Sequence, residues 1–401
     1  MQILVICQYY YPENFQINTI CEKLAKNGEQ VTVLTGLPNY PAGKVLKKYK
    51  FFKKRNETIN DVQVIRCFEI GRRRGAFFLF LNYISFCISS IIKVLFLRKR
   101  FDCVYVYQLS PVMMALPGIL YSKRKKVPLY LYCCDLWPES LKMYIGNEKN
   151  ILFKAVKKLS GKIYSSCKYI SVQSMSFIEY FIKEHGIKTE KLEYIPGFSD
   201  DRYLNNEYVL DNGVIDFVFL GNIGIAQNLN LVIDAFSKIK SYNYKLHIVG
   251  DGTCLSDLKK SVKDKGLEEN IIFYGRKPVE EMESFYSIAD ICIVTLNAEN
   301  KTGLTLPSKV QGYMAAGKPI VGMIDGDAYS IVNGSRCGKC VQAGDVSGFV
   351  NILEECIANI DLYKCLGENG RRYYKDNFSE DIVVGQIMKI LYKTVEEYKN
   401  V

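Results

Sequence analysis

The stretch "FVFLGNIGIAQNLNLVIDAF", residues 217–236, decides the fold. It begins as an apolar, β-rich run, turns at Gly221 and Gly224, and continues as an amphipathic helical pattern. A buried strand, a glycine-containing turn and a helix in this order form one unit of a doubly wound parallel sheet. The turn also places glycine backbone beside the N–H groups of a helix start, which suits a phosphate group. Any tight strand-to-helix turn can use glycine, so a purely structural interpretation stays open as well.

The same unit repeats along the whole chain. In the first half the apolar runs cover residues 3–7, 31–35, 62–66, 103–107, 129–133 and 169–173. In the second half they cover residues 215–221, 245–252, 271–275, 291–296 and 318–323. Uninterrupted apolar runs are typical of parallel strands that are buried on both faces. We therefore expect an α/β protein with two doubly wound, Rossmann-like domains facing a cleft, and ligands at the carboxyl ends of the strands.

The chain length of 401 residues also indicates two domains. Residues 196–213 are polar and rich in turn residues, and we interpret them as the linker. The predicted domains are residues 1–198 and residues 199–382. A C-terminal helix at about residues 383–401 is expected to pack back on the first domain.

Composition narrows the class of protein. The net charge of +11 indicates an anionic partner, and a hydrophobic content of 48% excludes a disordered chain. The 14 cysteines lie in apolar segments and no secretory signal precedes the first strand, so we expect reduced cysteines in a cytoplasmic protein. Cys337 and Cys340 have the spacing of metal ligands, but a zinc site needs two more ligands, and none is close in the sequence. His185 and His247 have structural interpretations, at a helix end and inside a strand.

Residues 76–97, "AFFLFLNYISFCISSIIKVLFL", are almost wholly apolar and have basic residues on both sides. Three interpretations stay open: a helix docked on an anionic membrane surface, a helix buried in its domain, and a membrane span. Asn82, Lys93 and the two basic flanks argue against a simple span. The basic, aromatic segment 47–55 in the same half favours the docked helix.

Several motifs resemble those of one enzyme family. In the second half they are "GNIG" (221–224), "VGDG" (249–252), "FYGRKPVEEMESFYSIADI" (273–291) and "TGLTLPSKVQGYMAAGKPIV" (302–321). In the first half they are "CQYYYPENFQIN" (7–18), "LTGLPNYPAGKV" (34–45), "QLSPV" (108–112) and "DLWPESL" (135–141). Over nearly the whole chain the sequence resembles family 4 glycosyltransferases of GT-B fold. The similar branch includes bacterial L-fucosamine transferases of surface-polysaccharide assembly.

The resemblance implies that the second domain binds a UDP-sugar donor and the first domain an acceptor. Lys309 is expected to act in catalysis by neutralising the donor diphosphate. The other expected donor contacts are Gly221, Asn222, Gly224, Gln227, Gly250, Asp251, Gly252, Arg276, Lys301, Thr305 and Ser308. The expected acceptor contacts are Tyr10, Glu13, Asn14, Asn39, Tyr40 and Trp137. The tyrosine-rich loop after the first strand would then present aromatic faces to a glycan, although one or two of its tyrosines are expected to pack in the core.

The sequence departs from the wider family at charged positions. Many members carry an arginine and a lysine where this chain has Asn222 and Gln227, and a pair of glutamates where it has Leu304 and Gly312. Lys309 and the backbone amides of the glycine turn would therefore balance more of the phosphate charge. The resemblance leaves the ribose contact open.

Two carboxylates follow the strand at 129–133. Asp135 and Glu139 are expected to hydrogen-bond the sugar or the acceptor hydroxyl at the reacting centre. For Asp135 the structural alternative is the N-cap of the helix that follows. The "DGD" at 325–327 is similar to a metal-binding motif, but it follows a strand of the second domain and is interpreted as a turn. We expect no metal and no other cofactor.

Together these features predict a retaining, metal-independent glycosyltransferase. It would move a sugar, such as N-acetyl-L-fucosamine or another N-acetylhexosamine or deoxysugar, from a UDP-sugar to a lipid-diphosphate-linked acceptor in capsule, O-antigen or exopolysaccharide assembly. The expected location is the cytosolic face of the plasma membrane, bound peripherally to anionic lipid and not to nucleic acid. A non-catalytic sugar or lipid binder of the same fold is the alternative. A nicotinamide-dependent enzyme is disfavoured, because neither half has a GxGxxG turn after its first strand.

Overall fold

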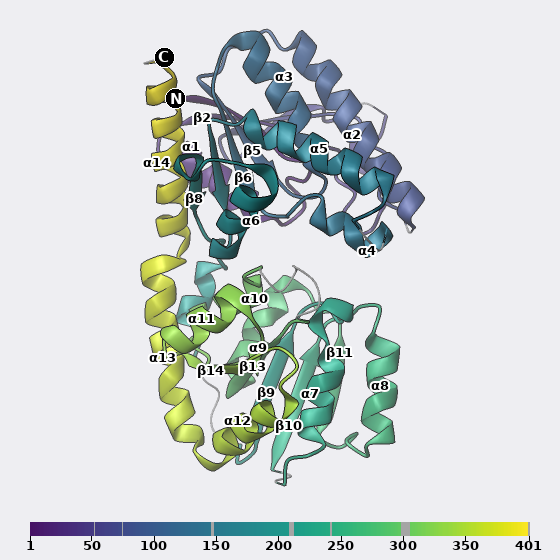
Figure 1. Ribbon diagram of the computed structural model, residues 1–401, viewed down its shortest axis with the longest axis vertical. Helices are drawn as coiled ribbons and strands as arrows, with labels where there is room; N and C mark the ends of the chain where they lie inside the picture. The colour runs from purple at the N-terminus through teal and green to yellow at the C-terminus, as the bar shows by residue number, and fades with distance from the viewer. Residues whose placement is uncertain are drawn as a thin grey trace. The chain divides into compact units, whose positions relative to one another are not determined.

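The computed structural model describes the chain except residues 52, 74, 146–147, 208–211, 241–242, 298–304 and 400–401, and except the side chains of Met143 and Tyr144. The chain divides into two compact units. The first contains residues 1–196 and 384–401, and the second contains residues 197–383. Each unit is a doubly wound α/β domain (Figure 1).

The first unit is built on a sheet with the strand order β3-β4-β2-β1-β5-β6-β7-β8. Its strands are β1 (Gln2–Ile6), β2 (Gln30–Thr35), β3 (Asn56–Ile59), β4 (Val62–Arg66), β5 (Cys103–Gln108), β6 (Leu129–Cys133), β7 (Tyr169–Val172) and β8 (Leu192–Tyr194). Its helices are α1 (Gln16–Lys26), α2 (Ala76–Phe96), α3 (Leu116–Lys125), α4 (Lys142–Ile145), α5 (Ile151–Ser165) and α6 (Met175–His185). Neighbouring strands are parallel, except that β3 and β4 form an antiparallel hairpin.

The second unit has the strand order β11-β10-β9-β12-β13-β14, and its neighbouring strands are all parallel. Its strands are β9 (Ile215–Leu220), β10 (Tyr244–Val249), β11 (Ile271–Gly275), β12 (Ile291–Thr295), β13 (Ile320–Met323) and β14 (Gly338–Val341). Its helices are α7 (Leu229–Phe236), α8 (Leu255–Asp264), α9 (Met282–Ile288), α10 (Ser308–Ala315), α11 (Gly326–Gly334), α12 (Val346–Ala358) and α13 (Ile360–Asn377). The strand order reverses between β9 and β12, and ligands of such sheets bind beside this point.

Strand β9 explains why the opening stretch is apolar throughout. Phe217 and Phe219 belong to the core on one face of the sheet, which includes residues of α7, α8 and α12. Val218 and Leu220 belong to the core on the other face, which includes residues of α9, α10 and α11. Because both faces are covered by helices, successive side chains of the strand are all buried.

The prediction of two Rossmann-like domains is confirmed, and each predicted apolar run contains a strand. The strands β3, β8 and β14 were not predicted.

The predicted linker is not a free connection, because it packs on the second unit. Gln311 donates a 2.8 Å hydrogen bond to the Gly197 carbonyl, and Ser199 N donates a 3.1 Å bond to the Tyr374 hydroxyl.

The last helix, α14 (Glu380–Lys399), belongs to the first unit from Val384 onward. Within that unit Lys393 forms a 3.1 Å ion pair with Glu193, and the Tyr169 hydroxyl donates a 2.7 Å hydrogen bond to Glu397. The C-terminal segment thus contacts the strands at the β7–β8 edge of the first sheet.

Candidate active site

The glycine turn after β9 lies at the point where the strand order of the second unit reverses. Gly221 has φ +135°, a conformation that other residues rarely adopt, and its N–H donates to the Val249 carbonyl at 2.9 Å. A Cβ on Gly250 would lie 1.8 Å from the Gly221 carbonyl oxygen, and one on Gly252 would lie 2.2 Å from that of Ile223. The "VGDG" glycines are therefore required for the close approach of two loops. The expected donor contact of Gly250 and Gly252 stays a prediction beside this packing role.

The Lys309 ammonium lies against this turn, although Lys309 itself belongs to the first turn of α10. Its Nζ is 3.7 Å from the centroid of the Phe219 ring, and a Cβ on Gly221 would be only 3.2 Å from it. The Nζ is buried, and no described residue accepts a hydrogen bond from it. Burial lowers the pKa of Lys309 to about 7. A buried ammonium without an acceptor is costly, so this position is suited to an anion that supplies the missing oxygen atoms.

Asn222 and Gln227 occupy the positions at which many family 4 members have basic residues. Asn222 Nδ2 donates a 3.0 Å hydrogen bond to Gln227 Oε1, and the same oxygen accepts the Gly224 N–H at 3.2 Å. The two side chains thus brace the turn. The Gly221 and Gly224 amides, which were expected to face the diphosphate, both donate hydrogen bonds within the protein.

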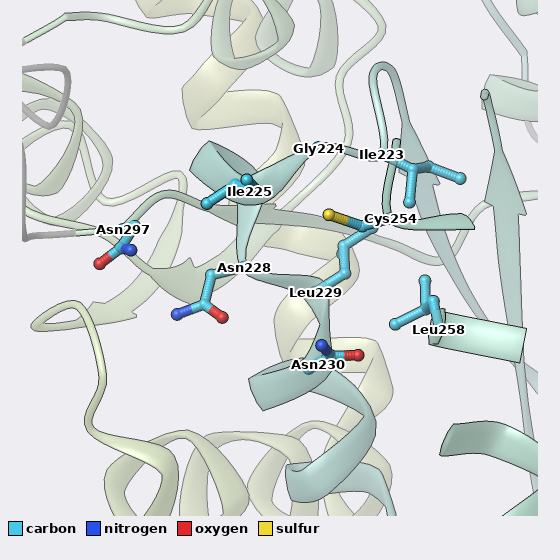
Figure 2. Close-up of a pocket in the computed structure, with 9 residues that line it drawn as sticks. All are labelled: Ile223, Gly224, Ile225, Asn228, Leu229, Asn230, Cys254, Leu258 and Asn297. Atoms are coloured by element: carbon cyan, nitrogen blue, oxygen red, sulfur yellow. The ribbon is translucent and has the colours of Figure 1, made fainter. Parts of the chain in front are cut away.

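A pocket of about 160 Å³ opens beside the turn (Figure 2). Its described lining residues, none of them charged, are Ile223, Gly224, Ile225, Asn228, Leu229, Asn230, Cys254, Leu258 and Asn297. Asn228 begins α7 in a left-handed conformation with φ +45°, and Asn297 N donates to the Ala226 carbonyl at 2.7 Å. Amide and apolar groups together suit an uncharged polar ligand such as a sugar. Sequence reasoning missed Asn228 and Asn297, although Asn228 follows a glycine turn and asparagine is a common residue at positive φ.

The other expected donor residues surround the same edge of the second sheet. Arg276 follows β11 and is exposed, Asp251 accepts the Gly252 N–H at 2.8 Å, and Ser308 is exposed in the first turn of α10. Thr305 lies three residues before α10 and is half-buried. The expected contact Lys301 lies outside the described residues.

In the first unit, Asp135 lies two residues after the end of β6 and is surrounded by donors. Its Oδ2 accepts hydrogen bonds from the Ser110 hydroxyl and from Trp137 Nε1 (3.3 Å), and its Oδ1 accepts one from the Ser140 hydroxyl. Burial raises the pKa of Asp135, while these bonds and one from the Leu136 N–H lower it. Four donors occupy the lone-pair positions of the two oxygens. The geometry therefore favours a role in holding the turn over the expected direct contact at the reacting centre.

Two neighbouring residues are also engaged within the domain. Trp137 is only 8% exposed, and its single N–H donates to Asp135 and to Ser110 (3.0 Å). Glu139 accepts a 3.1 Å hydrogen bond from the Tyr180 hydroxyl and pairs with Lys142. These contacts favour a role of Trp137 in supporting the turn over the predicted contact with the acceptor.

The loop after β2 carries Tyr40, one of the two exposed residues among the expected acceptor contacts. Glu13 is buried and its Oε1 accepts the backbone N–H groups of Asn39 (2.7 Å) and Tyr40 (2.5 Å). Burial raises the pKa of Glu13 to about 7, against the lowering effect of these bonds. The Tyr40 side chain is 46% exposed, and Asn14 is exposed too. Glu13 and Asn39 are interior residues that hold the loop, and Tyr10 is fully buried in the core, so burial disfavours the predicted acceptor contact of all three.

Tyr40 belongs to an aromatic platform with Tyr9 and Phe15. The Phe15 ring is stacked 5.2 Å from the Tyr9 ring and lies 5.5 Å from the Tyr40 ring, centroid to centroid. The Arg72 guanidinium lies 5.9 Å from the Tyr40 ring centroid. Sequence reasoning missed Phe15 and Arg72, because only the fold brings the loops after β1, β2 and β4 together. An aromatic face beside a guanidinium suits a sugar ring that carries a phosphate.

Helix α2 is partly packed on the first unit and partly exposed. Its buried side chains are Asn82, Phe86, Cys87, Ser90 and Val94. Its most exposed apolar side chains are Phe77 (68%), Phe80 (56%), Ile88 (53%), Ile92 (52%) and Phe96 (77%). Of the described helices it is the one long and apolar enough to cross a membrane, and 28% of that apolar stretch is buried. One face of α2, which includes Asn82 and Ser90, is thus packed on the domain, while an apolar face of the same helix is exposed.

Among the described residues, no group of three histidine, cysteine or carboxylate side chains is placed to hold a metal ion. Asp325 of the "DGD" motif precedes α11, and its Oδ1 accepts a 3.0 Å hydrogen bond from Ala343 N. Gly326 and Asp327 lie in the first turn of α11, so the motif begins a helix, and the expectation of a simple turn is wrong.

Comparisons with known proteins identify the class of protein. Residues 202–373 match the family described as "Glycosyl transferases group 1", so the second unit is a group 1 glycosyltransferase domain. The protein is a glycosyltransferase of GT-B fold.

Three similar proteins cover most of the chain. The probable glycosyltransferase WbjE of Pseudomonas aeruginosa is 26% identical, over 68% of this chain and 69% of its own length. The putative colanic acid biosynthesis glycosyl transferase WcaI of Escherichia coli K12 is 24% identical, over 89% of this chain and 92% of its own. The crystal structure of Anabaena Alr3699/HepE in complex with UDP aligns with a TM-score of 0.72 at 15% identity, over 98% of this chain and 100% of its own.

Proposed function

We propose that the enzyme transfers a sugar from a UDP-sugar to a lipid-diphosphate-linked glycan, with retention of the anomeric configuration and without a metal ion. The observation that carries this proposal is the buried Lys309 ammonium, which lies against the turn after β9. No described residue accepts a hydrogen bond from it. A donor diphosphate would supply the oxygen atoms that the ammonium lacks. The pocket lined by Asn228 and Asn297 would take the uncharged part of the donor nearby.

In the proposed reaction the bond between the anomeric carbon and the β-phosphate oxygen breaks, and the bond to the acceptor oxygen forms. The leaving group is UDP, and Lys309 stabilises the charge that develops on its phosphate. The acceptor hydroxyl gives its proton to the departing phosphate oxygen. No side chain of the protein has to act as a strong base in this scheme.

The comparisons support the nucleotide and the pathway class. HepE, which shares the fold, was crystallised with UDP, and WcaI is named for colanic acid biosynthesis. We infer a role in the assembly of a bacterial surface polysaccharide. The donor sugar that we propose, N-acetyl-L-fucosamine or another N-acetylhexosamine or deoxysugar, rests on the motifs that resemble the fucosamine-transferase branch.

The proposed acceptor site is argued from residues of the first unit. The aromatic platform with Arg72 would bind the sugar and phosphate of the acceptor, and its lipid chain would stay in the bilayer. The exposed apolar face of α2 and the basic residues beside it suit a peripheral position on an anionic cytosolic membrane surface. The buried Asn82 and Ser90 on the opposite face of α2 argue against a span, because a spanning helix would have to leave these contacts.

Two measurements test the proposed function. Thermal unfolding is followed with a panel of UDP-sugars, because a ligand at 100 times its Kd stabilises the folded state by about 2.7 kcal/mol. UDP release is then measured with the stabilising donor and a lipid-diphosphate-linked acceptor. Stabilisation by UDP-sugars followed by acceptor-dependent UDP release is expected. Stabilisation by GDP-sugars alone, or UDP release that does not depend on an acceptor, would contradict the proposal.

A further inference from the structure

Glu69 lies at the centre of a buried cluster of amide side chains in the first unit. Its Oε1 accepts hydrogen bonds from Gln8 Nε2 (2.8 Å), Asn39 Nδ2 (3.2 Å) and Asn82 Nδ2. All four side chains are at most 1% exposed. We call these four residues the Glu69 cluster. They come from the loops after β1, β2 and β4 and from α2, so one carboxylate joins four segments.

The backbone makes room for this carboxylate at Gly36. A Cβ on Gly36 would lie 1.7 Å from Glu69 Oε2 and 2.9 Å from the Gln8 carbonyl oxygen, so a larger residue would displace the cluster. Without the carboxylate, three buried amides would lose an acceptor, and each loss costs about 1–3 kcal/mol. An apolar core of the same volume would stabilise the domain as well or better, so stability alone does not explain a polar cluster here.

The cluster connects directly to the loop that carries Tyr40. Asn39, which bonds Glu69 through its side chain, donates its backbone N–H to Glu13. Glu13 also accepts the backbone N–H of Tyr40 at 2.5 Å. A series of hydrogen bonds, continued through the covalent frame of Asn39, therefore runs from Asn82 on α2 to the backbone N–H of Tyr40, the residue whose exposed ring belongs to the aromatic platform.

On α2, Asn82 uses both its amide nitrogen and its amide oxygen in hydrogen bonds. Asn82 donates a 2.7 Å hydrogen bond to the Ile70 carbonyl and accepts one from Gln8 Nε2 at 2.9 Å, in addition to its bond with Glu69. Two residues earlier on the same helix, Phe80 is 56% exposed. The same turn of α2 thus carries the exposed apolar side chain of Phe80 and the buried Asn82, at which the series of hydrogen bonds begins.

We propose that the Glu69 cluster is a positioning device that ties the Tyr40 loop to α2, so that the placement of α2 sets the geometry of the acceptor platform. The inference rests on the proposed acceptor site. Asn82 and Glu69 are positioning residues, because they act on the acceptor through Asn39 and Glu13.

The test compares Asn82→Leu with a matched control, Ser90→Ala. Ser90 is buried on the same helix, but among the described residues its hydroxyl bonds the Phe86 and Cys87 carbonyls of α2 itself. Asn82→Leu keeps the approximate size of the side chain but makes it apolar, which removes both its donor and its acceptor. We expect it to raise the KM for the acceptor about tenfold, the equivalent of one lost buried hydrogen bond, with UDP affinity changed less than twofold. Ser90→Ala should leave both values near those of the wild type.

Hydrogen exchange gives a second reading that does not depend on activity. Amides of residues 37–45 should exchange about tenfold faster in Asn82→Leu, and at the wild-type rate in Ser90→Ala. Faster exchange without any sugar transfer by the wild type would support the coupling and refute the proposed function. An unchanged acceptor KM and unchanged exchange in folded Asn82→Leu, or equal acceleration by Ser90→Ala, would overturn the coupling. If Asn82→Leu fails to fold, Asn82→Asp, which keeps the side-chain size and removes the donor, is judged by the same outcomes.

Discussion

Lys309 Nζ lies 3.7 Å from the centroid of the Phe219 ring, so the first turn of α10 reaches back over the end of β9. The ring is the main favourable partner of the ammonium among the described residues, because no hydrogen-bond acceptor is in reach. A cation over an aromatic face is stabilised far less than a cation paired with an anion. The Lys309 ammonium therefore lies in a position that suits the binding of an anionic ligand.

Replacing Lys309 by methionine should weaken UDP binding by about 1–3 kcal/mol, the scale of a hydrogen bond to a charged group. Isothermal titration calorimetry with UDP measures the effect. Lys259→Met is the control, since Lys259 also lies over a ring of this unit, 5.5 Å from the Phe273 centroid, but is exposed. Equal UDP affinity in folded Lys309→Met and in the wild type would refute the contact.

The UDP affinity should also depend on pH in a defined direction. Burial lowers the pKa of Lys309 to about 7 in the free protein, and a bound diphosphate would raise it again. Above that pH binding must take up a proton, so affinity should fall as pH rises, by at most about tenfold per pH unit. In Lys309→Arg the side chain stays protonated, and this fall should disappear. The same slope in both proteins would assign the titration to another group.

Asp135→Asn should lower the midpoint of thermal unfolding and the turnover together. An amide has one acceptor oxygen in place of two, and its NH2 group would face the donors that Ser110, Trp137 and Ser140 now direct at the carboxylate. We expect a loss of about 1–3 kcal/mol in the free energy of unfolding. Asp102→Asn, at an exposed carboxylate that accepts the Gln2 N–H at 2.7 Å, is the control. A large loss of turnover at unchanged stability would restore the direct catalytic role.

Tyr40→Ala should raise the KM for the acceptor several-fold and leave the UDP affinity unchanged. Stacking of a ring on an aromatic side chain contributes about 0.5–1.5 kcal/mol, which sets the size of the effect. Steady-state kinetics with varied acceptor measures it. The corresponding change at Tyr329, which is 37% exposed in the second unit, serves as the control. An effect on UDP affinity alone would place Tyr40 on the donor side.

Replacing Phe77, Phe80 and Phe96 by serine should release the protein from anionic vesicles without unfolding it. These three side chains are each more than half exposed, so little packing is lost. High salt should loosen the wild type only in part, because it screens the basic residues and leaves apolar burial intact. Co-sedimentation beside circular dichroism measures both properties. Leu362→Ser, at an apolar residue that is 59% exposed in the second unit, should change nothing.

A triple variant that binds vesicles as the wild type does would exclude α2 as the docking surface. A variant that unfolds would support the buried-helix interpretation. Together with the salt dependence, these outcomes separate the interpretations of residues 76–97 that the sequence left open.

The motif residues of the second unit illustrate what could be predicted. Apolar runs bounded by glycine specified the strands β9 and β10, because burial on both faces of a parallel sheet is visible in the local sequence. The strand β14 was missed, since a four-residue strand at a sheet edge carries little pattern. Lys309 was selected from its motif, but only the fold placed its ammonium on Phe219.

The first unit shows the opposite case. Glu13, Asn39 and Trp137 were predicted as acceptor contacts from motifs that resemble the family, and the structure buries all three among hydrogen-bond partners. Polar residues at the carboxyl ends of strands can either meet a ligand or hold the loops that do so. Residue type alone does not distinguish these roles, because the difference lies in which side chains reach the surface.

The sequence by itself determined the two doubly wound sheets, the enzyme family that the motifs resemble and the apolar helix at residues 76–97, since periodicity and glycine turns act over a few neighbouring residues. Only the tertiary structure decided which of its side chains are free to bind. The Glu69 cluster joins Gln8, Asn39, Glu69 and Asn82, and the platform joins Phe15 to Tyr40, across separations that no local pattern records. Burial and hydrogen bonding are properties of these long-range neighbours, and they exist only once the sheet has brought its loops to one edge.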